Sequence, residues 1–248
     1  MGLASSLKSR VAKLGKSVVQ GHRASTDAYV AHLKNIGVKM GDDVVIFSPG
    51  RTNIDEQNPH LLSFGSHVAM TGPVTILTHD YSVGVTKVWT HGEILGSQKP
   101  VSIGSNVFLG WGCTVLPGTT IGDNCIVGAG SVVSGNVEGG SVWGGVPGKR
   151  ICSLEEYYER RKSKQLEEAC TIYRLYKERF SVTPPIEVFH EYFYLFTTSS
   201  DGLCERFRQK LDDHENADEC LRWIDEHEHA FGNYEEFCEY AEGRLHHT

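Results

Sequence analysis

One histidine in this sequence has neighbours that suggest chemistry. His79 follows the segment VTILT at 74–78 and precedes Asp80 and Tyr81. An imidazole titrates near neutral pH, so it can accept a proton from a hydroxyl and return it later in the same reaction. Positioned acid–base catalysis of this kind contributes roughly 10²–10⁴ in rate. We expect His79 to be a general base; the alternative is a histidine that only forms hydrogen bonds in a turn.

The element that must position His79 is a six-residue repeat. From Ile103 the sequence reads IGSNVF, LGWGCT, VLPGTT, IGDNCI, VGAGSV and VSGNVE. A period of six fits neither a helix nor an alternating strand, and fixed-period similarity is typical of a solenoid. We expect triangular coils of three hexads each, stacked by backbone hydrogen bonds between parallel coils. The leading aliphatic residue points inward, a small residue or valine packs beside it, and Gly permits the corner conformation.

The six-residue frame extends toward the N-terminus and breaks once. Ile46 and Phe64 are eighteen residues apart, which equals three hexads, and Met70 and Ile76 continue the step. Ile76 and Ile103 are twenty-seven residues apart, which is not a multiple of six. An extruded loop is therefore expected at about 80–100, and loops on a rigid scaffold often carry function.

Helical segments are expected on both sides of the repeat domain at 37–152. Residues 1–36 read as a helical N-terminal segment, in which Ser25 is a candidate N-cap. Residues 153–248 read as an α-helical appendage that opens with a capping box at Ser153 and continues as a one-sided apolar stripe. Pro184-Pro185 should end this helix and open another. Core candidates further on include Phe207, Trp223, Ile224 and Phe237.

Charge is divided unevenly along the 248 residues, whose net charge is −7. Residues 1–39 carry a net charge of +6 and residues 201–248 a net charge of −9. This pattern argues against nucleic acid as a partner. The basic N-terminus and the opening Met-Gly-Leu-Ala-Ser-Ser, a myristoylation pattern, allow a weak membrane-surface contact. The alternative is a solvated helix that covers one end of the coil.

The cysteine pattern and the hydropathy favour a cytoplasmic location. The seven cysteines include no CxxC pair, and Cys113 and Cys125 occupy small-residue positions of the hexads, as packing residues in a reducing compartment would. No apolar run approaches the roughly 20 residues needed to span a membrane. No signal peptide with a proper apolar centre is recognisable.

Three segments carry a resemblance to a known family. They are VTILTHDYS at 74–82, VGAGSVV at 127–133 and GGVPGKRI at 144–151. The sequence resembles the hexapeptide-repeat acyltransferase superfamily, in particular its maltose, galactoside and capsular-polysaccharide O-acetyltransferases, over roughly 37–160. The resemblance implies a mainly β fold, a left-handed parallel β-helix with helical ends. It also implies a homotrimer with sites between subunits and direct acetyl transfer from acetyl-CoA to a hydroxyl.

The resemblance also assigns the acetyl-CoA site. Phe108 would pack on the pantetheine arm, and the backbone N–H of Trp111 would bind the thioester oxygen as an oxyanion hole. The family often has a small residue at the position of Trp111 and a lysine at that of Gly135, so both are departures. Lys149 and Arg150 would contact the CoA phosphates. The full set of expected cofactor contacts is Phe108, Trp111, Gly112, Ala129, Ser134, Gly135, Lys149 and Arg150.

The acceptor side is less well defined by the sequence. Asp55, Asp80, Tyr81 and Trp89 lie in the two irregular loops, where carboxylates and aromatic rings suit sugar hydroxyls and ring faces. Asp80 has two other possible roles, orienting His79 or capping the turn. The expected acceptor is a sugar or a surface-polysaccharide unit. The alternatives are serine or a hydroxylated antibiotic, and a non-catalytic solenoid scaffold.

The histidines and Cys113 allow two other chemistries, zinc binding and covalent catalysis. His60, His67 and His91 together with His79 could offer imidazoles to Zn²⁺ across a subunit boundary, as in the β-helical carbonic anhydrases. Their positions do not match the metal histidines of those enzymes, so no metal is expected. Cys113 fills an interior position and is a poor nucleophile, so no covalent acyl-enzyme is expected.

Overall fold

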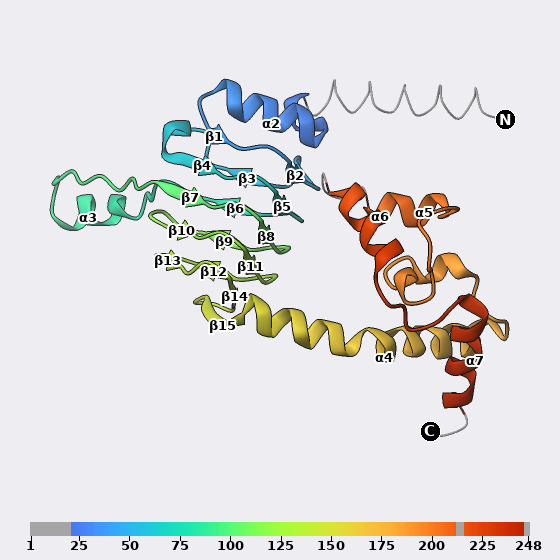
Figure 1. Cartoon of the computed structure of the whole chain (residues 1–248). Helices are drawn as coiled ribbons and strands as arrows, with labels where there is room; N and C mark the ends of the chain where they lie inside the picture. The colour runs from blue at the N-terminus through green and yellow to red at the C-terminus, as the bar shows by residue number, and fades with distance from the viewer. Residues whose placement is uncertain (1–20, 212–215, 246–248) are drawn as a thin grey trace. The chain divides into compact units, whose positions relative to one another are not determined.

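The computed structural model describes residues 21–211 and 216–245. The chain divides into two compact units, of which the first ends at Tyr157 and the second begins at Tyr158. The first unit contains the short strands and the second contains helices (Figure 1). The expectations for residues 1–20, including the membrane-surface contact, lie outside the described residues. Among the described residues, no helix has both the length and the apolar character needed to cross a membrane.

The first unit is a coil whose chain passes repeatedly through three sheets, A, B and C. Sheet A is parallel and consists of β1 (Lys39–Met40), β4 (Leu62–Phe64), β7 (Val101–Ile103), β10 (Thr120–Ile121) and β13 (Asn136–Val137). Sheet B contains β2 (Val44–Ile46), β5 (Val68–Met70), β8 (Val107–Leu109), β11 (Cys125–Val127) and β14 (Ser141–Gly144), which are parallel, and the antiparallel β15 (Lys149–Ser153). Sheet C is parallel and consists of β3 (Asn53–Ile54), β6 (Thr75–Ile76), β9 (Thr114–Val115) and β12 (Val132–Val133).

The corners between the sheets carry the residues of interest. The C–A edge is where the chain passes from sheet C to sheet A, at residues 55–61, 77–100, 116–119 and 134–135. The B–C edge is where it passes from sheet B to sheet C, at residues 47–52, 71–74, 110–113 and 128–131. Successive coils are stacked in Figure 1, so residues at one edge form a column.

The hexad pattern predicted the inward-facing side chains correctly. The leading aliphatic residues of the six hexads are at most 2% exposed, and they are Ile103, Leu109, Val115, Ile121, Val127 and Val133. The small residues Cys113, Thr119 and Ser131 are also buried, at 0–1% exposure. Burial of these side chains supplies the hydrophobic stabilisation of the coil.

The register of the first coil differs from the prediction. Ile46 pairs with Met70 in sheet B, whereas Phe64 lies in sheet A and pairs with Met40. The eighteen-residue spacing of Ile46 and Phe64 therefore does not mark one turn. The irregular segment 47–61 lengthens this coil, and the partners in sheet B are twenty-four residues apart.

The glycines that follow the aliphatic residues are needed for a different reason than expected. Gly104, Gly110 and Gly122 are not among the residues with positive φ. Instead, a Cβ atom at Gly104 would lie 2.8 Å from the Asp123 backbone nitrogen of the next coil, and at Gly110 it would lie 2.6 Å from that of Ala129. Close approach of the coils, and not a left-handed conformation, therefore excludes a side chain there.

A loop leaves the coil after His79, as the broken frame predicted. Its base is clamped where Asp80 N–H donates to Ser97 O (3.0 Å) and Lys99 N–H donates to Thr78 O (2.8 Å). The loop contains α3 (Val83–Trp89), which projects from the coil in Figure 1. The N-terminal end of the coil is covered by η1 (Gly21–Ala24) and α2 (Thr26–Asn35). Ser25 Oγ accepts from Ala28 N–H, as expected of an N-cap.

The second unit is built on α4 (Leu154–Phe180), which starts before the unit boundary. The predicted capping box is present, with Ser153 N–H donating to Glu156 and Glu156 N–H to Ser153 Oγ. The predicted helix after Pro185 is instead two short 3₁₀ turns, η3 (Ile186–Phe189) and η4 (Phe193–Leu195). The remaining helices are α5 (Glu205–Leu211), α6 (Ala217–Glu226) and α7 (Tyr234–Leu245).

Aromatic side chains form most of the core of this unit. Tyr173, Phe189, Phe193, Phe207 and Phe237 are at most 3% exposed. Trp223 was also predicted to belong to the core, but it is 49% exposed. The exposed ring lies at the edge of a pocket, which is described below.

Candidate active site

His79 and Asp55 meet at the C–A edge on adjacent coils. Ile54 pairs with Ile76, so the residues that follow these two strands lie beside each other. His79 Nδ1 lies 2.5 Å from Asp55 Oδ2. The side chain of His79 is 15% exposed and that of Asp55 is 3% exposed. The imidazole is therefore held from within the coil but still reaches the surface.

Asp55, which was predicted on the acceptor side, contacts His79 and also lines the pocket beside it. Its Oδ2 accepts from Thr78 N–H at 3.0 Å and from Thr78 Oγ1 at 2.5 Å, and its Oδ1 accepts from Gln57 N–H at 3.2 Å. Burial raises the pKa of Asp55, but the hydrogen bonds from Thr78, His79 and Gln57 outweigh it and hold the pKa below 3.8. The buried carboxylate therefore holds the imidazole in place.

The charge of Asp55 determines which nitrogen of His79 carries the proton. An ionised carboxylate can only accept hydrogen bonds, so Nδ1 must donate to it. In the neutral ring Nε2 then has a free lone pair. This is the arrangement that a general base requires.

A pocket of about 540 Å³ opens beside His79. Its wall includes four polar side chains that the sequence analysis did not identify, Arg23, Asn53, Glu56 and Gln57. Arg23 comes from η1, where no local pattern relates it to His79; it also donates to Thr52 O at 3.0 Å. The full lining is Arg23, Asn53, Ile54, Asp55, Glu56, Gln57, Leu77 and His79.

The other predicted acceptor residues are distributed differently around His79. The Tyr81 ring meets that of His79 edge-on with centroids 4.6 Å apart, and Tyr81 Oη donates to Gln57 Oε1 at 3.1 Å. Asp80 caps the turn, because it accepts from Ser82 N–H and Oγ, which lower its pKa. Trp89 lies on α3, 80% exposed, and is not part of the pocket wall.

The side chains around Glu56 raise the question of a metal. His22, His32 and Glu56 have potential ligand atoms within 4.8 Å of one another, the one such group among the described residues. Glu56 Oε1 already accepts from Arg23 at 2.7 Å and from Tyr29 Oη at 3.0 Å. The guanidinium supplies the positive charge that a metal would bring. These groups form an ion-pair network that joins α2 to the coil, and we propose no metal ion at this place.

The predicted cofactor residues lie in four places. Phe108 projects from the outer face of sheet B, whereas Trp111, Gly112 and Ala129 lie together at the B–C edge. Ser134 and Gly135 lie at the C–A edge. Lys149 and Arg150 are exposed on β15, and Arg150 is 3.6 Å from Glu138.

The Trp111 backbone N–H is available to a ligand. Trp111 O accepts from Gly130 N–H at 2.8 Å, which ties the corner to the next coil. Within the described part of the chain, the Trp111 N–H donates to no backbone carbonyl. The indole is 49% exposed and Arg51 lies over it, 4.9 Å from the centroid.

His79 and Trp111 lie at opposite ends of sheet C. Trp111 comes before β9 at the B–C edge, whereas His79 comes after β6 at the C–A edge. The two strands are parallel neighbours, so the length of the strands separates these two residues. A single chain does not bring His79 and the Trp111 N–H together.

Cys113 is not available as a nucleophile. It is 1% exposed, and burial raises the pKa of its thiol to about 12. The thiolate, which is the reactive form, is therefore disfavoured at neutral pH. This agrees with the expectation of a packing role.

Comparison with known proteins finds the same repeat. The family model described as the hexapeptide repeat of succinyl-transferase matches residues 100–134. Protein CapG of Staphylococcus aureus is 38% identical over 125 residues, which are 50% of this chain and 71% of CapG. Galactoside O-acetyltransferase of Escherichia coli (strain K12) is 30% identical over 103 residues, 40% of this chain and 51% of that protein.

The solved structures include similar chains. One of them, galactoside acetyltransferase in complex with coenzyme A, aligns with 60% of this chain and 80% of that chain at 24% identity and a TM-score of 0.39. The chain spans about half the length of the E. coli relative named above.

Proposed function

This chain belongs to the hexapeptide-repeat acyltransferase superfamily, and from that premise we propose that it transfers an acetyl group from acetyl-CoA to a hydroxyl of a saccharide. The observation that carries this proposal is the hydrogen bond between His79 Nδ1 and Asp55 Oδ2 (2.5 Å) beside an open pocket. A hydroxyl that enters the pocket reaches an imidazole that Asp55 already orients.

His79 Nε2 accepts the proton as the acceptor oxygen attacks the thioester carbonyl. The new C–O bond gives a tetrahedral oxyanion, which the Trp111 N–H stabilises. The C–S bond then breaks, and the thiolate of CoA takes the proton from the imidazolium. Asp55 stays ionised throughout and favours the protonated ring at the transition state. No acyl-enzyme forms.

A second copy of the chain completes the site. His79 and Trp111 are at opposite ends of sheet C within one chain, so the base of one copy has to meet the oxyanion hole of another. An apolar row on the outer face of sheet B supports contact between copies through its accessible members Val45, Phe108 and Ile126, whereas Ala69 and Val142 of the same row are already buried. We propose a left-handed coil in a homotrimer with three such composite sites.

The apolar arm after His79 offers further contact area. Val85, Val88, Trp89 and Ile94 are 73–80% exposed, which is unusual for side chains of this size. In the trimer this arm packs on a neighbouring copy. Trp89 then contributes to the assembly or to a neighbour's acceptor site.

Acetyl-CoA lies along the B–C edge in this proposal. Phe108 packs on the pantetheine arm, Gly112 and Ala129 allow close approach, and Lys149 and Arg150 bind phosphate. Ser134 and Gly135 share the C–A edge with His79 and approach the cofactor from the other copy. The seven cysteines show no paired spacing in the sequence, which supports a reducing compartment, the cytoplasm.

A saccharide fits the pocket beside His79 because its wall combines donors and acceptors. Arg23, Asn53 and Gln57 offer both, and the exposed Tyr81 offers a ring. One relative is named galactoside O-acetyltransferase, and another of Escherichia coli (strain K12) is named for O-acetyl transfer in lipopolysaccharide biosynthesis.

The test follows thiol release from acetyl-CoA with a panel of mono- and oligosaccharides, with serine and with chloramphenicol. Release that depends on a saccharide supports the proposal. Thiol release that depends only on serine or chloramphenicol would show that the acceptor is an amino acid or an antibiotic and not a saccharide. If the protein neither binds CoA nor releases thiol, it is a non-catalytic scaffold.

A further inference from the structure

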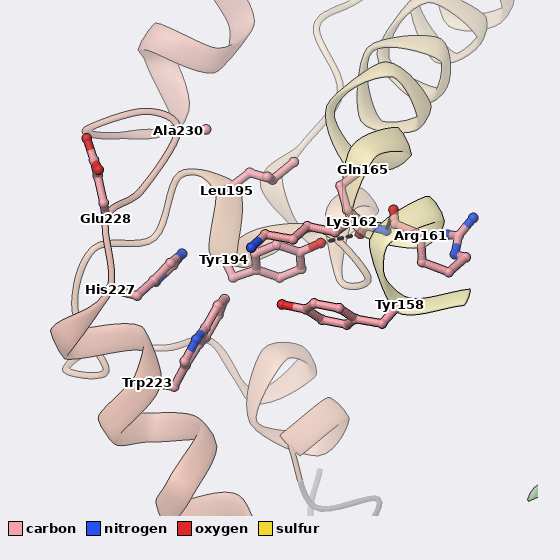
Figure 2. Close-up of a pocket in the computed structure, with 10 residues that line it drawn as sticks. All are labelled: Tyr158, Arg161, Lys162, Gln165, Tyr194, Leu195, Trp223, His227, Glu228 and Ala230. Carbon is pink, nitrogen blue, oxygen red and sulfur yellow. Dashed lines mark hydrogen bonds between the residues drawn. The ribbon is translucent and has the colours of Figure 1, made fainter. Parts of the chain in front are cut away.

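The second unit contains a pocket that the proposed acetyl transfer does not use. It has a volume of about 660 Å³, within the 300–1,000 Å³ range common for small-molecule sites. It lies entirely in the unit that begins at Tyr158. Figure 2 shows its lining, which is Tyr158, Arg161, Lys162, Gln165, Tyr194, Leu195, Trp223, His227, Glu228 and Ala230.

Aromatic rings form two facing walls of this pocket. Trp223 stacks on His227 with centroids 3.7 Å apart and an interplanar angle of 16°. Tyr194 meets the Trp223 ring edge-on, with centroids 5.8 Å apart, and Tyr158 lies across the hollow (Figure 2). Trp223 is 49% exposed and Tyr158 is 54% exposed. Large rings left open to solvent in a concave place are typical of ligand sites.

The Trp223–His227 wall carries no charge at neutral pH. Burial lowers the pKa of His227, and the neighbouring His229 lowers it further. The ring is therefore neutral when the protein is near pH 7. The wall presents a flat, uncharged surface.

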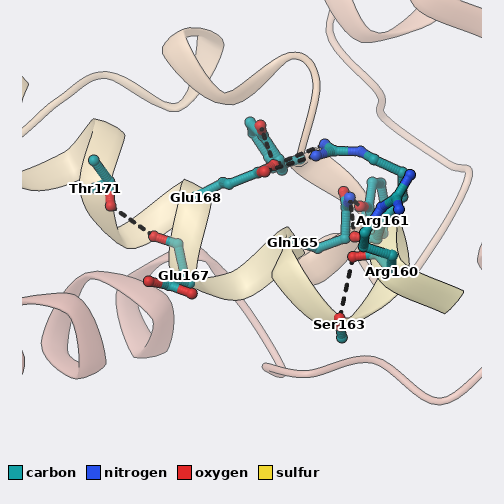
Figure 3. Close-up of polar contacts among 9 residues, drawn as sticks. Arg160, Arg161, Ser163, Gln165, Glu167, Glu168 and Thr171 are labelled. Atoms are coloured by element: carbon teal, nitrogen blue, oxygen red, sulfur yellow. Dashed lines mark hydrogen bonds and ion pairs between the residues drawn. The ribbon is translucent and has the colours of Figure 1, made fainter. Parts of the chain in front are cut away.

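The opposite wall is held in place by hydrogen bonds. Arg161 donates to both carboxylate oxygens of Glu168 at 2.7 Å, and Glu168 also accepts from Tyr192 Oη at 3.0 Å (Figure 3). Gln165 donates to Arg161 O at 2.8 Å and accepts from Tyr194 Oη. A lining that is already ordered loses little entropy when a ligand binds.

The charges of the pocket disfavour polyphosphate ligands. The guanidinium of Arg161 is balanced by Glu168, and Lys162 lies over the Tyr158 ring, 5.6 Å from its centroid. Glu228 adds a carboxylate to the lining. A nucleotide would meet few uncompensated cations here.

We propose that this pocket binds a neutral saccharide. The apolar faces of sugar rings match the flat faces of Trp223 and Tyr158. Lys162 and Glu228 provide a donor and an acceptor for hydroxyl groups. This inference goes beyond acetyl transfer, because the pocket holds a glycan whether or not the chain acetylates it.

The test measures binding of maltotetraose, cellotetraose and chitotetraose to the full-length protein by saturation-transfer NMR and titration calorimetry. We expect at least one of them to bind at millimolar concentration or below. Trp223→Ala should weaken this binding about tenfold or more, and Trp223→Phe, which keeps a ring, should weaken it less. Trp223→Ala should leave thiol release from acetyl-CoA with a monosaccharide acceptor unchanged, which separates this site from the catalytic one.

A matched control comes from the same unit. Tyr240 is 40% exposed but is not part of the pocket wall, so Tyr240→Ala should leave binding unchanged. If none of the three tetrasaccharides binds, or if Trp223→Ala binds as tightly as the wild type, the proposal is wrong. Binding of uridine diphosphate that Trp223→Ala abolishes would assign the pocket to nucleotides instead.

Discussion

His79 Nδ1 and Asp55 Oδ2 are 2.5 Å apart, and the same carboxylate oxygen accepts from the backbone N–H and the hydroxyl of Thr78. The side chain that orients the imidazole is therefore itself fixed by the residue before the histidine. Its ionised state requires the proton of the neutral ring to be on Nδ1. His79 and Asp55 are therefore arranged for proton abstraction before a substrate binds.

Replacing this carboxylate should impair catalysis without removing the base. We expect Asp55→Asn to lower kcat by about a hundredfold, since an amide neither fixes one tautomer nor stabilises the protonated ring. Steady-state rates of wild type and Asp55→Asn measure this effect, and the affinity for CoA should stay unchanged. An Asp55→Asn variant with the wild-type kcat would show that the carboxylate does not act through the base.

The lowered pKa of Asp55 also predicts a pH dependence of stability. The folded state favours the ionised carboxylate, so its contribution to the free energy of unfolding is complete above the ordinary pKa of 3.8. It is lost as the pH falls through the lower folded pKa. The difference between wild type and Asp55→Asn in urea unfolding should thus be constant near neutral pH and shrink below pH 3.8.

The exposed Asp201 provides the control for this measurement. Asp201→Asn should unfold like the wild type at every pH. A difference for Asp55→Asn that grows as the pH falls would contradict the assigned sign.

The separation of His79 and Trp111 by sheet C predicts complementation between chains. His79→Ala lacks the base and Trp111→Pro lacks the backbone N–H, so each trimer alone should be inactive. Random mixed trimers contain intact sites where the two variants adjoin, about a quarter of the total in an equal mixture. Activity of the co-expressed, tag-purified mixture measures this. An inactive mixture of folded trimers would place the whole site within one chain.

The close approach of the coils predicts a steric cost at Gly104. A Cβ atom there would lie 2.8 Å from the Asp123 backbone nitrogen, so Gly104→Ala should destabilise the coil by about 1–3 kcal/mol. Gly84 on α3 is the matched control, because a Cβ atom there has nothing within 4 Å. Gly84→Ala should be neutral or stabilising by up to about 1 kcal/mol. Equal effects of both variants in chemical unfolding would refute the steric explanation.

The sequence predicted those parts of the structure that obey a local period. The inward aliphatic residues, the loop after His79 and the capping box at Ser153 follow from spacing and residue type alone. The partner of His79 does not, because the irregular segment 47–61 hides the register that places Asp55 beside it. Arg23 reaches the pocket only through the packing of η1 and α2, for which the sequence holds no periodic signal.

The helical unit shows the same limit. Its apolar residues were recognisable, and most of them are buried as expected. Trp223 was predicted to be buried together with Ile224, but consecutive helical residues point in different directions, and the pocket leaves the Trp223 ring half exposed. Whether an aromatic residue fills a core or lines a cavity depends on which elements pack over it, and α4 and α6 are far apart in the sequence.

The most direct test of the proposed mechanism is a single-turnover measurement of acetyl transfer by wild type and His79→Ala, with acetyl-CoA bound and saturating acceptor. If His79 Nε2 is the general base, the rate of the chemical step should fall by a factor of about 10²–10⁴ in the variant, with unchanged affinity for CoA. A chemical step that proceeds at the wild-type rate without the imidazole would contradict the account.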